Sequence, residues 1–225
     1  MRFMLWLLCL LLLAPLQADE QSIRPGVNRN YENPDWRQWV QTFESPRREV
    51  YAKRQAIVEA SAVRPGMVVA DIGAGTGLFT RLFATSVAPT GKVYAIDIST
   101  TFIDNILRTC REQGLTNVEG IVNPPRETGL PDASVDLAFV ANTYHHFEYP
   151  HSMLASIRRA LRRDGRLIVI DFHRDPRLNT PWIIGHVRAG KDTVIGEIRA
   201  AGFRLVADQP VLRSNYFLVF EKTGS

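Results

Sequence analysis

The 225-residue sequence contains few cysteines, no apolar run long enough to span a bilayer, and no strong excess of either charge. Its two cysteines are Cys9 and Cys110, so residues 19–225 hold a single thiol and form no internal disulfide. The unbroken apolar run from Phe3 to Leu13 is shorter than the about 20 residues that a transmembrane helix needs. Because the net charge is only +4 and basic residues are mixed with acids, the composition indicates no nucleic-acid-binding surface.

Residues 1–18 are expected to be a signal peptide and not part of the fold. Arg2 precedes the apolar run, and Leu16-Gln17-Ala18 is a cleavage site that ends in a small residue. This pattern predicts an exported, periplasmic protein. The alternative is an uncleaved segment that anchors the chain in the inner membrane.

After this segment, the chain divides into an arm and one domain. Residues 19–45 are polar and interrupted by proline and glycine, which predicts an extended N-terminal arm. Residues 46–225 have the length of a single domain, and the apolar content of 45% over the whole chain indicates a real core. The side chains expected to anchor the arm are Trp36, Trp39 and Phe43.

Short apolar runs alternate with amphipathic stretches in the domain, which predicts a parallel sheet with helices on both faces. The last two strands are joined without a helix, so they should be antiparallel. We therefore expect a three-layer, Rossmann-like α/β fold whose seven-stranded, mostly parallel sheet has an antiparallel last strand. The expected strands are residues 68–72, 92–96, 118–122, 135–141, 166–171, 203–207 and 216–221, with helices over 46–62, 77–86, 101–113, 151–162 and 191–201.

A glycine-rich turn follows the first expected strand. The segment from Asp71 to Gly77 reads D-I-G-A-G-T-G, and its three glycines allow a ligand to approach the backbone closely. Dinucleotide-binding turns space their glycines G-x-G-x-x-G around a pyrophosphate, which the Asp71 carboxylate would repel. A cationic ligand without phosphate, S-adenosylmethionine, suits this turn better. A nicotinamide-dependent oxidoreductase is the disfavoured alternative.

A second acid, Asp97, ends the next strand about 20 residues beyond the last glycine. A carboxylate at this position is placed to accept hydrogen bonds from both ribose hydroxyls of a nucleoside. The two acids and the glycine turn occur in the expected order on strand, turn, helix and strand. Together they predict a nucleoside-containing cofactor.

With these motifs, residues 46–222 resemble the class I S-adenosylmethionine-dependent methyltransferases, and most closely the methyltransferase-11 group of small-molecule enzymes. The resemblance rests on Asp71 to Gly77, on Asp97-Ile98, on Leu130-Pro131 before the fourth strand, and on Leu161 to Ile170. The chain is also similar to exported bacterial members whose fourth strand ends in Tyr-His-His-Phe-Glu. The resemblance implies the methyltransferase variant of the Rossmann-like fold.

The resemblance also implies which residues bind the methyl donor. The first acid would hold the ammonium group, the glycines would admit the methionine half, and the second acid and its successor would bind ribose and adenine. Relatives have an acid after the third strand for the adenine amino group, where this chain has Asn123 followed by Pro124. The resulting donor-binding set is Asp71, Gly73, Gly75, Gly77, Asp97, Ile98, Asn123 and Asn142.

The acceptor is expected at the carboxyl end of the fourth strand, where open α/β sheets bind their ligands. The candidate catalytic residues there are Tyr144, His145 and His146. Adjacent residues of an extended segment point apart, so at most one of the two histidines should face the donor. The alternative is that one histidine caps or hydrogen-bonds the following helix and the other lies at the surface. No histidine has the spacing of a metal site, so no metal is expected.

A loop with His186, Arg188 and Lys191 precedes the last helix, and a basic lid of this kind would suit an anionic acceptor. A solvated, charged loop is the alternative reading. The function predicted from the sequence is methyl transfer from S-adenosylmethionine to a small molecule, with no nucleic-acid partner and with membrane contact only through an uncleaved N-terminal segment. The alternative is an inactive nucleoside-binding or sensor module of the same fold.

Overall fold

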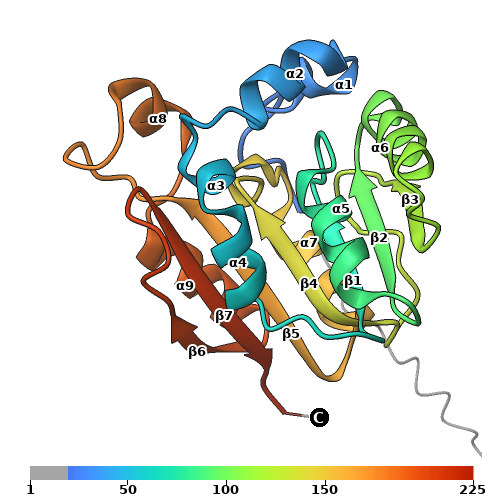
Figure 1. Cartoon of the computed structure of the whole chain (residues 1–225). Coiled ribbons are helices and arrows are strands. Elements are labelled where there is room, and N and C mark those ends of the chain that lie inside the picture. Colours follow the sequence, from blue (N-terminus) through green and yellow to red (C-terminus); the bar gives the residue numbers. More distant parts are fainter. Residues whose placement is uncertain (1–19, 225) are drawn as a thin grey trace, which may run out of the picture.

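The computed structural model describes residues 20–224, which are built around one seven-stranded sheet (Figure 1). The strand order is β3-β2-β1-β4-β5-β7-β6, and β7 runs antiparallel to both of its neighbours while the other pairs are parallel. This arrangement confirms the predicted fold class. The strands are β1 (Val68–Ile72), β2 (Lys92–Asp97), β3 (Val118–Val122), β4 (Val135–Ala141), β5 (Leu161–Phe172), β6 (Phe203–Asp208) and β7 (Asn215–Lys222).

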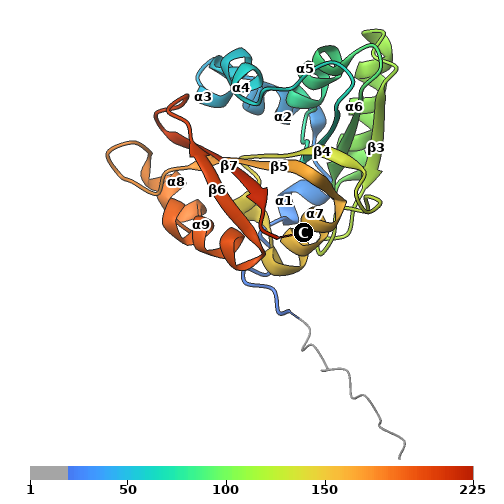
Figure 2. The same ribbon diagram turned by 90° about the horizontal axis from the view of Figure 1, so that it is seen from below.

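Helices cover both faces of the sheet (Figure 2). One face carries α3 (Glu49–Ala52), α4 (Arg54–Ala60), α5 (Leu78–Val87) and α6 (Thr100–Glu112), and the other carries α7 (Pro150–Ala160) and α9 (Lys191–Ala200). The remaining helices are α1 (Arg29–Glu32), α2 (Trp36–Phe43), the 3₁₀ turn η1 (Tyr144–His146) and α8 (Pro181–His186).

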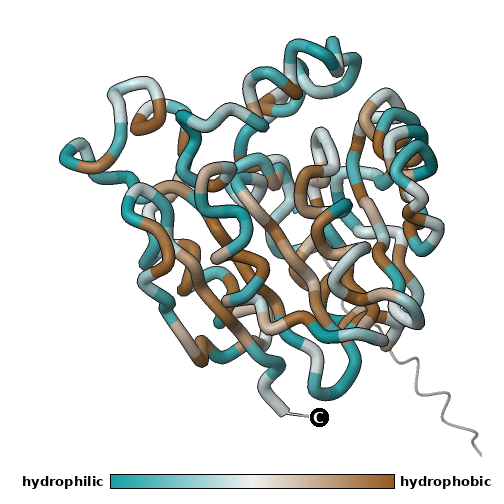
Figure 3. The backbone as a smooth tube through the Cα atoms, in the orientation of Figure 1, coloured by the Kyte–Doolittle hydropathy of each residue, from teal (hydrophilic) through white to brown (hydrophobic). Residues whose placement is uncertain are grey.

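The central strands are apolar along their whole length because both of their faces are buried. Val69 packs with the α5 side chains Phe79 and Phe83, whereas the next residue, Ala70, belongs to the core beneath α7. Figure 3 shows hydrophobic strands at the centre of the molecule and more hydrophilic segments around them. The apolar runs that the sequence analysis expected to be strands therefore form the buried centre of the sheet.

The predicted extended arm is wrong, because residues 29–43 form the two helices α1 and α2. The Asp35 side chain caps α2 by accepting hydrogen bonds from the backbone N–H groups of Arg37 and Gln38. Trp39 and Phe43, two of the three predicted anchors, pack on Tyr31 of the same arm, with ring centroids 4.8 and 6.5 Å from the tyrosine ring.

Two other predicted elements differ from the structure. The single helix expected over residues 46–62 is divided at Lys53 into α3 and α4, and the loop before the last expected helix contains α8. The predicted signal peptide, residues 1–18, lies outside the described residues. Within residues 20–224, none of the helices is both long and apolar enough to cross a membrane.

Candidate functional site

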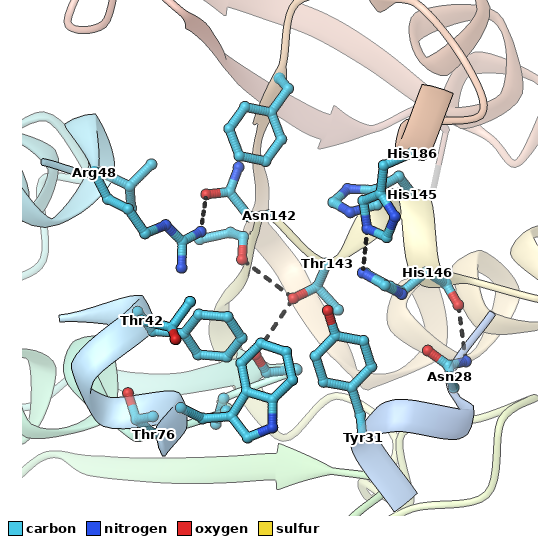
Figure 4. A pocket seen from close by; sticks show the side chains of 18 of the residues that line it. Asn28, Tyr31, Thr42, Arg48, Thr76, Asn142, Thr143, His145, His146 and His186 are labelled. Carbon is cyan, nitrogen blue, oxygen red and sulfur yellow. Dashed lines mark hydrogen bonds between the residues drawn. The ribbon is translucent and has the colours of Figure 1, made fainter. Parts of the chain in front are cut away.

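A cavity of about 880 Å³ opens at the carboxyl ends of β1, β2, β4 and β5. Its walls come from α1 and α2, the turn after β1, the end of β2, the loop after β3, the segment after β4, and α8. Figure 4 shows how side chains from these distant segments converge on it. Open α/β sheets bind ligands at this edge, so the cavity lies where the fold favours a site.

The glycine turn forms one wall of the cavity. At Gly73, where φ is +70°, a Cβ atom would lie 2.1 Å from Cγ2 of Thr143, so the Thr143 side chain packs directly on this glycine. Gly75 lies against the Phe43 ring and lines the cavity. Gly77 does not line it; a Cβ there would meet Ile106 of α6 at 2.8 Å, so this glycine serves helix packing.

The Asp97 carboxylate is buried beside the turn. It accepts hydrogen bonds from the backbone N–H groups of Gly75 (2.9 Å) and Ser99 (3.0 Å). Burial raises the pKa of Asp97 to about 6, although these bonds oppose the shift. A carboxylate held this way retains lone pairs for further donors, such as the hydroxyls of a ribose.

The Asp71 carboxylate is also buried, and it accepts a hydrogen bond of 2.6 Å from the Thr80 hydroxyl. Burial raises its pKa to about 6. Neither acid has a cationic side chain within ion-pair distance among residues 20–224. A positively charged ligand in the cavity would therefore stabilise both ionised forms.

Two predicted adenine contacts lie on the cavity wall, at Ile98 and Asn123. The Asn123 amide donates to the carbonyl oxygens of Pro124 (2.9 Å) and Glu127 (2.8 Å). Because these two bonds use both amide hydrogens, the side-chain oxygen of Asn123 is the atom that can accept from an adenine amino group.

Arg48 and Asn142 form a polar pair on the opposite wall. The Arg48 guanidinium donates to the Asn142 side-chain oxygen at 3.0 Å and lies over the Phe43 ring (Figure 4). Burial lowers the pKa of Arg48, and no carboxylate of residues 20–224 lies within ion-pair distance of its guanidinium. Asn142 in turn donates to the side chain of Asn215 at 2.7 Å.

The three candidate catalytic residues follow β4 on the 3₁₀ turn η1. Tyr144 is turned into the core, where its hydroxyl donates to Glu197 at 2.7 Å, and it does not line the cavity. His145 and His146 both line it, with ring centroids 4.3 Å apart. The expectation that adjacent side chains point apart is wrong, because it holds for a strand and not for a 3₁₀ turn.

His186 of α8 completes a group of three that we call the histidine cluster: His145, His146 and His186 (Figure 4). His145 Nδ1 lies 2.8 and 3.0 Å from the two oxygens of the buried Asp171 carboxylate at the end of β5. Burial and the neighbouring histidines lower the pKa of His146 to about 2 and that of His186 to about 4, so both rings are neutral at pH 7.

The arm covers the cavity from outside. Tyr31 lies edge-on against the His146 ring, with centroids 4.9 Å apart, and Phe43 lies over the glycine turn. The Asn28 side chain donates to the His146 carbonyl oxygen at 3.1 Å. An ion pair of 2.8 Å between Glu44 and Arg81 fixes the end of α2 to α5.

The loop before α9 does not provide the basic lid considered from the sequence. Arg188 pairs with Glu197 at 2.6 Å, and Lys191 pairs with Asp208, so their charges are compensated. Of the three residues named there, only His186 lines the cavity.

Known proteins resemble this chain in sequence and in fold. Residues 70–169 match the family model described as a methyltransferase domain. This stretch therefore has the sequence pattern of a methyltransferase domain.

The ubiquinone/menaquinone biosynthesis C-methyltransferase UbiE of Ectopseudomonas mendocina is 34% identical over 122 residues, which cover 52% of this chain and 46% of the relative. The UbiE of Burkholderia cenocepacia is 31% identical over 168 residues, which cover 68% of this chain and 66% of the relative. The chain thus matches about half to two thirds of the length of these curated relatives. A SAM-dependent methyltransferase from Aquifex aeolicus has the same fold, with a TM-score of 0.74, 24% identity, and coverage of 83% of this chain and 98% of that one.

The methyltransferase domain implies S-adenosylmethionine as its ligand, and the residues around the cavity fit that molecule. The glycine turn exposes backbone to the cavity at Gly73 and Gly75, and two buried acids and Arg48 line the same space. Sequence reasoning did not find that Arg48 lines the cavity or that Asp171 is the partner of His145. The pairing of Asp171 with His145 could have been inferred from the sequence, because β4 and β5 are neighbouring parallel strands whose carboxyl ends lie side by side.

Proposed function

We propose that this protein transfers a methyl group from S-adenosylmethionine to a small aromatic acceptor. The observation that supports this most is a single cavity that reaches from Asp97 and the glycine turn to the histidine cluster. Its volume of about 880 Å³ lies near the upper end of small-molecule sites, about 300–1,000 Å³, which leaves room for donor and acceptor together.

The chain's own residues would hold the donor at three points. Arg48 would bind the methionine carboxylate, because it is a buried cation that lacks a carboxylate partner among the described residues. Asp71 would bind the ammonium group, and Asp97 would accept hydrogen bonds from the ribose. S-adenosylmethionine supplies an electrophilic methyl carbon on a sulfonium, so the protein has mainly to align the acceptor and exclude water.

The acceptor would lie between the arm and α8, near the histidine cluster. Tyr31, Phe172 and Trp182 line this end of the cavity, and their rings favour a flat, apolar ligand. Because the curated relatives are named C-methyltransferases, we infer carbon as the methylated atom. In the transfer, the acceptor forms a bond to the methyl carbon, the carbon–sulfur bond breaks with its electron pair on sulfur, and the acceptor loses a proton.

An Arg48→Ala variant tests the donor site. Loss of a charged hydrogen bond costs about 1.5–3 kcal/mol, so calorimetry should show binding of S-adenosylmethionine weakened by about 10- to 150-fold. Methylthioadenosine, which lacks the amino-acid carboxylate, is the matched control and should bind parent and variant alike. Equal weakening of both ligands would show that Arg48 has only a structural role.

Turnover is tested with a labelled methyl donor and extracts of small molecules. We expect label in an aromatic product, micromolar binding of S-adenosylmethionine and S-adenosylhomocysteine, and no binding of NAD. Binding of the nucleosides without label transfer at high protein concentration would favour the sensor module instead. Binding of NAD alone would refute the donor assignment.

We also propose that the protein acts outside the cytoplasm, on the strength of residues 1–18, which have the sequence pattern of a signal peptide. A reporter that folds only after export, fused after residue 25, should be active. An inactive export reporter, together with activity of a cytoplasmic reporter fused at the same residue, would refute this location.

A further inference from the structure

The histidine cluster brings three imidazoles from two separate segments to one point of the cavity wall. One ring nitrogen of each residue lies within 4.8 Å of the corresponding atoms of the other two. His145 and His146 come from η1, and His186 comes from the end of α8. Methyl transfer with an activated donor needs at most one base, so three converging imidazoles are more than that reaction requires.

The distance between two of these rings matches shared coordination of a metal ion. Nε2 of His146 lies 3.3 Å from Nε2 of His186. Two nitrogens bound at 2.0–2.1 Å to a tetrahedral Zn²⁺ lie about 3.3–3.4 Å apart. The widest separation in the cluster is at most 4.8 Å and would have to shorten by about 1.4 Å for all three nitrogens to bind one tetrahedral ion.

The third ring has the environment of a metal ligand. Asp171 accepts the Nδ1–H of His145, and its carboxylate also accepts the backbone N–H groups of His145 (3.1 Å) and Phe172 (2.8 Å). The Nδ1 bond leaves Nε2 as the ring nitrogen of His145 that can bind a ligand. A carboxylate behind a histidine in this way fixes the ring and makes it a better donor to a metal ion.

A buried carboxylate lies behind the cluster. Asp171 and His145 are almost fully buried, with 1% and 4% of their surfaces exposed. The Arg24 guanidinium donates to the backbone carbonyl oxygen of His186, so an ion bound here would have one cationic neighbour besides the Asp171 carboxylate.

We propose that His145, His146 and His186 bind a divalent transition metal ion of the Zn²⁺ class, with a fourth coordination position open to the cavity. Three neutral imidazoles suit such an ion and do not suit Mg²⁺, which prefers oxygen ligands. The open position faces the acceptor end, so a hydroxyl of the acceptor would coordinate there and lose its proton more readily. Binding of the ion itself does not depend on the proposed methyl transfer.

The test is calorimetric titration of the untagged, metal-free full chain with Zn²⁺, and separately with Mg²⁺. We expect one Zn²⁺ per chain with micromolar or tighter affinity, and no binding of Mg²⁺. His186→Ala should weaken Zn²⁺ binding by at least 10-fold, and Asp171→Asn by about 10- to 100-fold. The matched control is His151→Ala, because His151 is exposed at the start of α7 and lies outside the cavity.

Visible absorption of bound Co²⁺ provides a second readout, because a four-coordinate site gives intense bands that His186→Ala should abolish. Circular dichroism shows whether each variant is folded, and His186→Gln replaces His186→Ala if it is not. Absence of Zn²⁺ binding to the parent, or equal binding to parent and His186→Ala, would overturn the proposal and leave a hydrogen-bonded histidine pair. Zn²⁺ binding without methyl transfer would refute the proposed function but not the metal site.

Discussion

Asp97→Asn removes one buried carboxylate and nearly preserves its volume, so it tests how the donor site affects stability. Burial raises the pKa of Asp97 to about 6 from the usual 3.8. Between these values the folded protein binds a proton that the unfolded chain does not. The free energy of unfolding must therefore fall as the pH rises through this range. From about pH 4.5 to pH 7.5, the loss due to Asp97 is about 2 kcal/mol.

The assay is urea denaturation of the parent and of Asp97→Asn at these two pH values, without donor. Other acids also titrate, so the useful quantity is the difference between the two proteins. Relative to the parent, the variant should gain about 2 kcal/mol in free energy of unfolding on going from about pH 4.5 to 7.5. Asp104→Asn, at an exposed position of α6, is the control and should follow the parent.

The same variant should bind the donor less tightly, by about 1.5–3 kcal/mol, because an amide is a poorer acceptor for ribose hydroxyls than a carboxylate. In the parent, donor affinity should fall as the pH drops below about 6, where Asp97 becomes protonated. Identical pH dependence of stability in parent and variant would refute the reasoning, since Asp97 would then not titrate in this range.

Two further changes test the turn and the arm. Gly73→Ala should lower the free energy of unfolding by about 2–4 kcal/mol in urea denaturation. The new Cβ would clash with Thr143, and alanine is strained at the positive φ of this position. A variant as stable as the parent would contradict this. Arg81→Ala removes the ion pair to Glu44. Residues 29–48 should then become more sensitive to limited proteolysis, while the melting temperature changes little. Unchanged cleavage would show that other contacts hold the arm.

The sheet was predictable from the sequence because its strands are continuous apolar runs bounded by turns. Val68–Ile72 and Val135–Ala141 are buried on both faces, and no local preference competes with that pattern. The place of Asp97 followed from the same logic, since it comes directly after buried residues at the end of β2.

The arm and the acceptor end were not predictable in the same way. Short helices such as α1 and α8 are stabilised by tertiary contacts more than by their own sequence. The convergence of His145 with His186 depends on η1, a single 3₁₀ turn of three residues, and on how the loop before α9 folds back. Neither the 3₁₀ turn nor the path of this loop produces a periodic pattern of apolar residues in the sequence.

The arm touches both ends of the cavity with one short stretch of chain. Tyr31 rests on His146 and Phe43 rests on Gly75, and only about a dozen residues separate them. A movement of the whole arm would therefore uncover both ends of the cavity. The spent nucleoside and the methylated product should leave in the same opening event, so any delay in releasing one of them delays the other.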